Sequence, residues 1–70
     1  MIVLPSLQYE IRAEIRRNLL TNYQVAERMG ISISTFYQRM QRHMDEADAE
    51  PYFAAIRELA EERKRALRGW

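Results

Sequence analysis

Four polar side chains, none of them acidic, recur at a helical spacing in one stretch of this 70-residue chain: Ser34, Gln38, Gln41 and Arg42. At about 3.6 residues per turn they fall on one side of a helix, opposite Phe36, Met40 and Met44. A glutamine amide can bond the N6 and N7 atoms of adenine, a serine hydroxyl can bond several bases, and an arginine can bind guanine or a phosphate. This side of the helix therefore predicts contacts with base edges of DNA.

Three further residues border this polar side. Thr35 lies at its edge, and Tyr37 and Arg39 flank it on opposite sides. No acidic residue interrupts the surface between residues 32 and 44, which suits a polyanionic partner. Two alternatives stay open: Tyr37 can pack against the first helix instead, and Arg39 and Arg42 can form an ordinary solvated face.

The chain offers no comparable set of residues for catalysis or metal binding. It has no cysteine and a single histidine, His43, so neither a thiolate site nor a histidine cluster can form within one chain. Ser34, His43 and Asp45 are the residue types of a nucleophile triad, but no oxyanion element or pocket is expected beside them in so short a chain. We therefore expect no enzyme, no metal, no cofactor and no small-molecule ligand.

Charge and composition indicate the kind of partner and the cell compartment that suit such a surface. Residues 1–44 carry six arginines against three glutamates, whereas residues 45–50, DEADAE, are acidic at four of six positions. This segregation is compatible with a nucleic-acid face. The lack of cysteine suits a reducing cytosol, and MIVLPSLQ at the N-terminus resembles neither a signal peptide nor a membrane span. We expect an intracellular, cytoplasmic protein.

Helices must position these residues, because no run of alternating β-branched residues is long enough for a strand. Residues 1–5, MIVLP, are expected to form an extended arm closed by Pro5. Ser6 is a candidate N-cap of a first helix. The apolar face of that helix is expected to hold four residues: Leu7, Ile11, Ile15 and Leu19.

A second and a third helix are expected on either side of Gly30. Thr21 is a candidate N-cap with Gln24 in a capping box, and the buried side of this second helix would hold Val25, Ala26 and Met29. Gly30 stands where a helix commonly ends on a left-handed residue. Ser32 is the next candidate N-cap, opening a helix with Phe36, Met40 and Met44 on its apolar face. The resulting pair of helices, residues 21–43, has the spacing of a helix–turn–helix.

The last third of the chain predicts one long helix. DEADAE is interpreted as a loop or as the fraying end of the third helix, and Pro51 suits the first position of a fourth helix over 51–68. Its inward side would hold Phe53, Ile56, Leu59 and Ala60. The fold class is therefore all-α: one domain over 1–70 with four helices, a fifth being left open.

The stretch LTNYQVAERMGISISTFYQRM resembles the helix–turn–helix of small phage and bacterial regulators of the lambda-repressor/Cro (XRE-like) type. Its second part, GISISTFYQRM, is also similar to the Fis-like and TetR-like versions of the motif. The resemblance covers residues 19–42. It implies a compact DNA-binding domain in the cytoplasm of a bacterium or of a phage-infected host cell.

The resemblance also implies roles for individual residues. Base-facing places would fall to Ile33, Ser34, Tyr37 and Gln38. The phosphate-contacting place would fall to Asn22 at the start of the second helix. Apart from the resemblance, we also expect phosphate contacts from Thr21, Ser32 and Arg39. Two positions depart from the pattern, since Asn22 stands where glutamine is usual and Ile33 where a polar base reader is usual. Ile33 is then either a thymine-methyl contact or a core residue.

The small size of the chain favours self-association. A domain this short buries only about 60% of its unfolded surface, and its two ends hold more apolar side chains than one small core plainly covers. These ends can pack within the chain or form a two-fold interface that holds two recognition helices about 34–36 Å apart. For the second case the expected interface residues are Tyr52, Phe53, Ile56, Leu59, Leu67 and Trp70.

Together these expectations describe a regulator that binds double-stranded DNA in a sequence-specific manner, as a homodimeric repressor on an inverted-repeat operator. Two rivals use the same residues differently. One is a DNA-handling accessory protein, such as a terminase-like packaging or recombination subunit. The other is a protein–protein adaptor that docks through its fourth helix.

Overall fold

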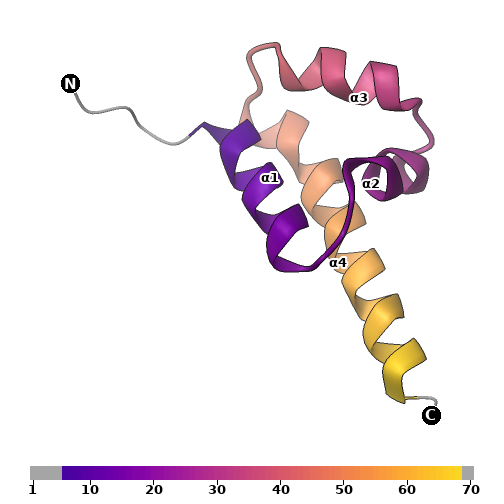
Figure 1. Cartoon of the computed structure of the whole chain (residues 1–70). Helices are drawn as coiled ribbons and strands as arrows, with labels where there is room; N and C mark the ends of the chain where they lie inside the picture. The colour runs from indigo at the N-terminus through magenta and orange to yellow at the C-terminus, as the bar shows by residue number, and fades with distance from the viewer. Residues whose placement is uncertain (1–5, 69–70) are drawn as a thin grey trace.

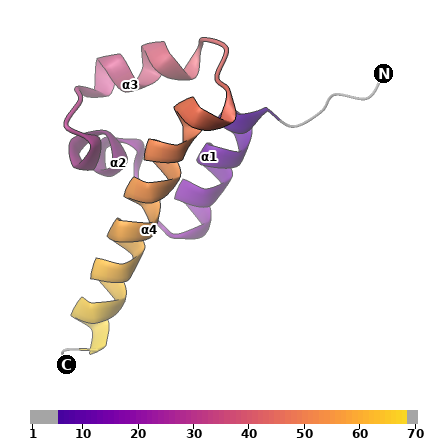
Figure 2. The same ribbon diagram turned by 180° about the vertical axis from the view of Figure 1, so that it is seen from behind.

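The computed structural model describes residues 6–68 and is all-α. Within this range four helices follow one another: α1 (Leu7–Arg17), α2 (Asn22–Met29), α3 (Ile33–Met40) and α4 (Glu46–Arg68). Both α1 and α2 pack against α4, and α3 packs on α2 and lies across one end of the bundle (Figure 1). The C-terminal half of α4 extends past the other helices, away from α3 (Figure 2).

The core is built from all four helices and the loop before α4. Its buried hydrophobic residues are Ile11, Ile15, Val25, Ala26, Phe36, Met40, Met44, Ala49, Tyr52, Ala55 and Ile56. Phe36 is fully buried, and its ring meets that of Tyr52 edge-on with the centroids 5.7 Å apart. Because α3 gives Phe36 and Met40 to this core, its opposite side is left to solvent.

The first helix begins as expected but ends earlier. Ser6 caps it, since its Oγ accepts the backbone N–H of Tyr9 at 3.2 Å. The expected apolar face is confirmed for Ile11 and Ile15, which are buried, but is wrong for Leu19, which is 72% exposed. The helix stops at Arg17, so Leu19 falls in the turn, and Leu20 packs against the core in its place.

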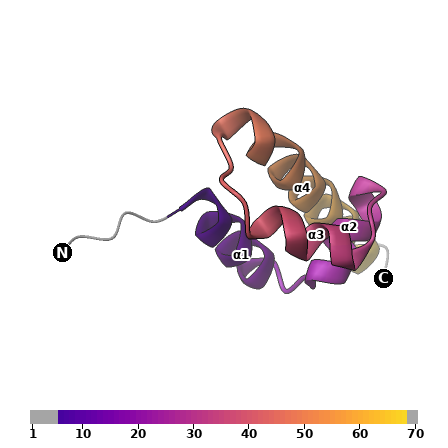
Figure 3. The same cartoon turned by 90° about the horizontal axis from the view of Figure 1, so that it is seen from above.

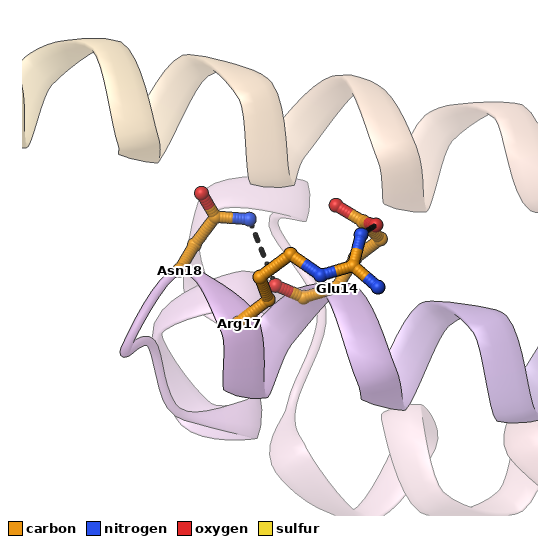
Figure 4. A network of polar contacts seen from close by, with 3 residues as sticks. All are labelled: Glu14, Arg17 and Asn18. Atoms are coloured by element: carbon orange, nitrogen blue, oxygen red, sulfur yellow. Dashed lines mark hydrogen bonds and ion pairs between the residues drawn. The ribbon is translucent and has the colours of Figure 1, made fainter.

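Polar contacts hold the end of α1. The Nδ2 atom of Asn18, the C-cap, donates to the carbonyl oxygen of Glu14 at 2.8 Å, and the guanidinium of Arg17 pairs with the Glu14 carboxylate (Figure 4). From α4, Arg63 Nη1 donates to the carbonyl oxygen of Leu19 at 2.8 Å. The side chains of Asn18 and Arg63 thus add hydrogen bonds to carbonyls of the last turn of α1 and of the turn after it.

The fourth helix starts five residues before the expected position. Asp45 and Asp48 bond each other's backbone N–H groups, at 2.8 Å for Asp48 N to Asp45 Oδ1 and 3.4 Å for Asp45 N to Asp48 Oδ2. The segment DEADAE therefore opens α4 instead of forming a loop, and carboxylates suit this end of a helix. Pro51, which was expected to be the first residue of this helix, lies inside it and is exposed.

The expected dimer interface needs correction at two positions. Tyr52 and Ile56 are each 3% exposed and belong to the core of this chain, so they are not available to a partner. Phe53 and Leu59 are half-buried and pack against that core. Leu67 is 67% exposed, and Trp70 lies outside the described residues. Within residues 6–68 no helix combines the length and the apolarity needed to cross a membrane.

Candidate nucleic-acid interface

A full capping box opens α2. Thr21 Oγ1 accepts the backbone N–H of Gln24 at 3.2 Å, and Gln24 Oε1 accepts the backbone N–H of Thr21 at 2.9 Å. These two bonds satisfy donors that the first turn of a helix leaves free. The expectation for this helix start is confirmed, and Asn22 becomes the first residue of α2.

A short turn then redirects the chain from α2 into α3. Gly30 is left-handed, with φ 76°, and its N–H and that of Ile31 bond carbonyls in the last turn of α2. Ser32 caps α3, since its Oγ accepts the backbone N–H of Thr35 at 3.1 Å. Ala26 is buried, as a small residue at the contact of two helices must be. Seen from above, α3 crosses over the rest of the bundle (Figure 3).

The two sides of α3 differ as the sequence predicts. Phe36 and Met40 are buried, and Ile33 is half-buried and packs against the core. The opposite side is exposed at four positions expected to contact bases: Ser34, Gln38, Gln41 and Arg42. The side chain of Ile33 is therefore partly buried, whereas Ser34 and Gln38 lie one helical turn apart with their side chains in solvent.

Tyr37 and Thr35 lie between these two sides. Tyr37 is 46% exposed, and its ring meets Phe36 edge-on with the centroids 5.9 Å apart. It can thus pack and still present its hydroxyl to a ligand. Thr35 is half-buried, and its Oγ1 accepts a hydrogen bond from Ser32 Oγ at 2.9 Å. Its hydroxyl proton remains available to an acceptor.

The third helix ends at Met40, one turn earlier than its apolar spacing predicts. Gln41 is the C-cap, and the N–H groups of Gln41 and Arg42 bond carbonyls three residues earlier, each at 3.2 Å. Met44 is still buried, but it reaches the core from the loop that follows. Of the four exposed polar residues, Ser34 and Gln38 therefore lie on α3 itself, and Gln41 and Arg42 lie in the turn after it.

One residue tied to this surface was not expected from the sequence. Gln8, the second residue of α1, is half-buried, and its Nε2 donates to the backbone carbonyl of Arg42. Nothing in the local pattern signals this contact, because the two residues are 34 positions apart. It links α1 to the turn that carries Gln41 and Arg42.

The residues expected at phosphates fall into two groups. The side chains of Thr21 and Ser32 are used in the caps, although the first N–H groups of α2 and α3 have no acceptor in their own helices. Asn22 is half-buried at the start of α2, and Arg39 is exposed beside the polar side of α3. Arg39 is thus the charged member of this set, and it is exposed on α3 itself.

Charges of both signs lie beside the exposed side of α3. Arg39 and Arg42 line a groove next to the end of α3, together with Arg28 of α2 and with Asp48 and Glu58 of α4. Behind α3, Arg28 is paired with Glu62 of α4; this hydrogen bond raises the pKa of Arg28 and lowers that of Glu62. Arg39 and Arg42 are thus the exposed cations of α3 and the turn after it, and α1 and α4 carry further exposed cations.

The described residues contain no group of three histidine or carboxylate side chains that could hold a metal ion. Comparisons with protein families, with curated proteins and with solved structures found no match to this chain. Its function must therefore be argued from the residues of the surface itself.

Proposed function

We propose that this protein binds double-stranded DNA through α3 and regulates transcription, most simply as a repressor that blocks polymerase. The observation that carries the proposal is the division of α3 into two sides. Phe36 and Met40 anchor one side in the core, while Ser34 and Gln38 are exposed on the other. A helix held in this way can enter the major groove, which is about 12 Å wide, with its polar side chains against base edges.

Each exposed residue then has a chemical role. Ser34 and Gln38 bond base edges near the centre of α3, and Gln41 and Arg42 reach bases further along the groove. Arg39 and the start of α2 at Asn22 meet phosphates, which fixes the register of the helix without reading sequence. No catalytic step, metal or cofactor is part of this function.

The proposal includes a homodimer, because two copies would read an inverted repeat with half-sites about 34–36 Å apart. Of the apolar residues first assigned to the interface, Phe53, Leu59 and Leu67 retain exposed surface. In this role the protein would work in the cytoplasm of a bacterium or of a phage-infected cell.

The test is selection of bound sequences from a random duplex library at about 150 mM salt, with wild type and Gln38→Ala in parallel. Wild type should enrich an inverted repeat. Gln38→Ala should relax the preference at one base pair of each half-site, at a cost of roughly 1–3 kcal/mol. Equal losses on the enriched and on random duplexes would contradict the role of α3 in recognition. An unenriched pool with weak, salt-sensitive binding would favour a DNA-handling protein, and no binding at all would favour an adaptor.

An arginine pair separates phosphate contact from base contact. Arg39→Ala should weaken binding to all sequences alike and lower the salt dependence by about one released counterion per protomer. Arg57 is also exposed but lies on α4, where it pairs with Glu50 at 3.5 Å. The control Arg57→Ala should leave affinity and salt slope unchanged, so similar losses from both variants would mean that the α3 surface is not the one that meets DNA.

A further inference from the structure

The two ends of the proposed recognition surface are held by different parts of the chain. At the N-terminal end, the Ser32 cap and the turn at Gly30 fix α3 to α2 over a few residues. At the other end the regular helix has stopped before Gln41 and Arg42. The buried side chains of Met40 and Met44 anchor this turn to the hydrophobic core.

Gln8 supplies the remaining restraint. Among the described residues, its bond to the carbonyl of Arg42 is the one side-chain hydrogen bond that reaches residues 33–44 from another helix. It fixes the peptide unit of Arg42, between the two methionine anchors. Because this carbonyl belongs to Arg42, the bond restrains the backbone of the turn that carries Arg42 and the adjacent Gln41.

We infer that Gln8 is a positioning residue for DNA recognition, an inference that rests on the proposed function. Gln8 does not need to touch DNA. It holds the turn after α3, so that Gln41 and Arg42 meet the same bases each time the helix enters the groove. Preference for the base pairs met by this end of α3 therefore depends on α1, whereas preference for those met by Ser34 and Gln38 does not.

Two variants remove the amide donor in different ways. Gln8→Met keeps the length of the side chain and its neutral charge, and Gln8→Glu keeps its shape but places a carboxylate oxygen where the donor was. Asn18→Asp is the matched control, because it also turns an amide into a carboxylate on α1. It removes the bond from Asn18 to the Glu14 carbonyl at the far end of that helix and changes the net charge by the same amount.

The readout is the selected base preference, position by position, with thermal unfolding to confirm that each variant is folded. Both Gln8 variants should lose discrimination, about tenfold, at the base pairs nearest the C-terminal end of α3. They should keep the preference at the pairs read by Ser34 and Gln38. Asn18→Asp should keep the wild-type profile throughout.

Several results would overturn the inference while leaving the proposed function in place. They are an unchanged profile in Gln8→Met, a uniform loss at all base pairs, or an equal loss in Asn18→Asp. If wild type enriches no sequence, the proposed function fails. The inference then fails with it, because there is no base preference that Gln8 could affect. The wild-type lane therefore distinguishes the two failures.

Discussion

The turn between α1 and α2 and the turn between α2 and α3 share one backbone conformation but place different residues in it. Each helix ends on a left-handed residue, which is Leu19 with φ 57° in the first turn and Gly30 with φ 76° in the second. Leu19 is the one residue other than glycine with positive φ among the residues that the structure describes. The difference between the turns is therefore one of side chain, not of chain path.

The hydrogen bonds of the two turns also match. In the first, Leu20 donates its N–H to the carbonyl of Ile15 at 2.9 Å; in the second, Ile31 donates to Ala26 at 3.0 Å. In both turns the left-handed residue donates to the carbonyl three positions earlier, at 3.1 Å and 3.0 Å. This is the Schellman arrangement, in which glycine is preferred because it has no Cβ.

The comparison indicates that the turn leading into α3 is relaxed and the turn leading into α2 is strained. A left-handed conformation costs a side-chain-bearing residue roughly 1–2 kcal/mol. Leu19 does not recover this cost by burial, since its side chain is 72% exposed. Contacts from α4 brace both regions, through Arg63 at the Leu19 carbonyl and through Glu62 at Arg28.

The largest effect should come from putting a side chain into the relaxed turn. A Cβ built at Gly30 has no atom within 4 Å, so Gly30→Ala tests backbone conformation without a clash. We expect the free energy of unfolding to fall by about 1 kcal/mol, because the left-handed cost exceeds the entropy gained by losing a glycine. Urea denaturation measures it, and unchanged stability would mean that φ at residue 30 can relax out of the left-handed region.

The opposite substitution should relieve the strained turn. Leu19→Gly is expected to raise the free energy of unfolding by about 0.5 kcal/mol, the relief of strain less the added entropy of the unfolded chain. Leu67→Gly is the control, because Leu67 is similarly exposed but lies in α4. Glycine there should destabilise the protein. Destabilisation by both changes would show that Leu19 contributes more to the fold than its exposure indicates.

The smallest effect concerns the ion pair between Arg28 and Glu62, near the turn from α2 into α3. Arg28 lowers the pKa of Glu62 below its ordinary value of 4.5, so this contribution to stability is complete above that value and is lost as pH falls through the lowered one. The contact is exposed, so its contribution is small. At neutral pH the Tm of wild type should be slightly higher than that of Glu62→Gln, and this difference in Tm should vanish in acid. A difference that stays constant in acid would show that the carboxylate charge is not its cause.

The features predicted from the sequence are those with a local cause. Thr21 with Gln24, and Gly30 with Ser32, lie within a few residues of the helix ends that they form, so residue type and spacing identify them. The early start of α4 also has a local cause, the Asp45–Asp48 pair, but Pro51 is the more conspicuous signal for the start of a helix.

The features that the sequence did not reveal depend on distant partners. Leu19 differs from an ordinary core leucine only because α1 stops before it, and Tyr52 is a core residue because the fold places its ring against that of Phe36. The bond from Gln8 joins residues that only the fold brings together. The exposed side of α3 was predictable by spacing, and its DNA-binding role remains a proposal.

The proposed contact between α3 and DNA can be tested by a backbone amide NMR titration of the full chain with a duplex of about 20 base pairs, long enough for two half-sites. If α3 meets DNA, resonance changes will concentrate at residues 32–42 and the first turn of α2, while residues 57–67 of α4 will be unaffected. Changes confined to α4, or no change even at low salt, where binding to phosphates is strongest, would contradict the proposed contact.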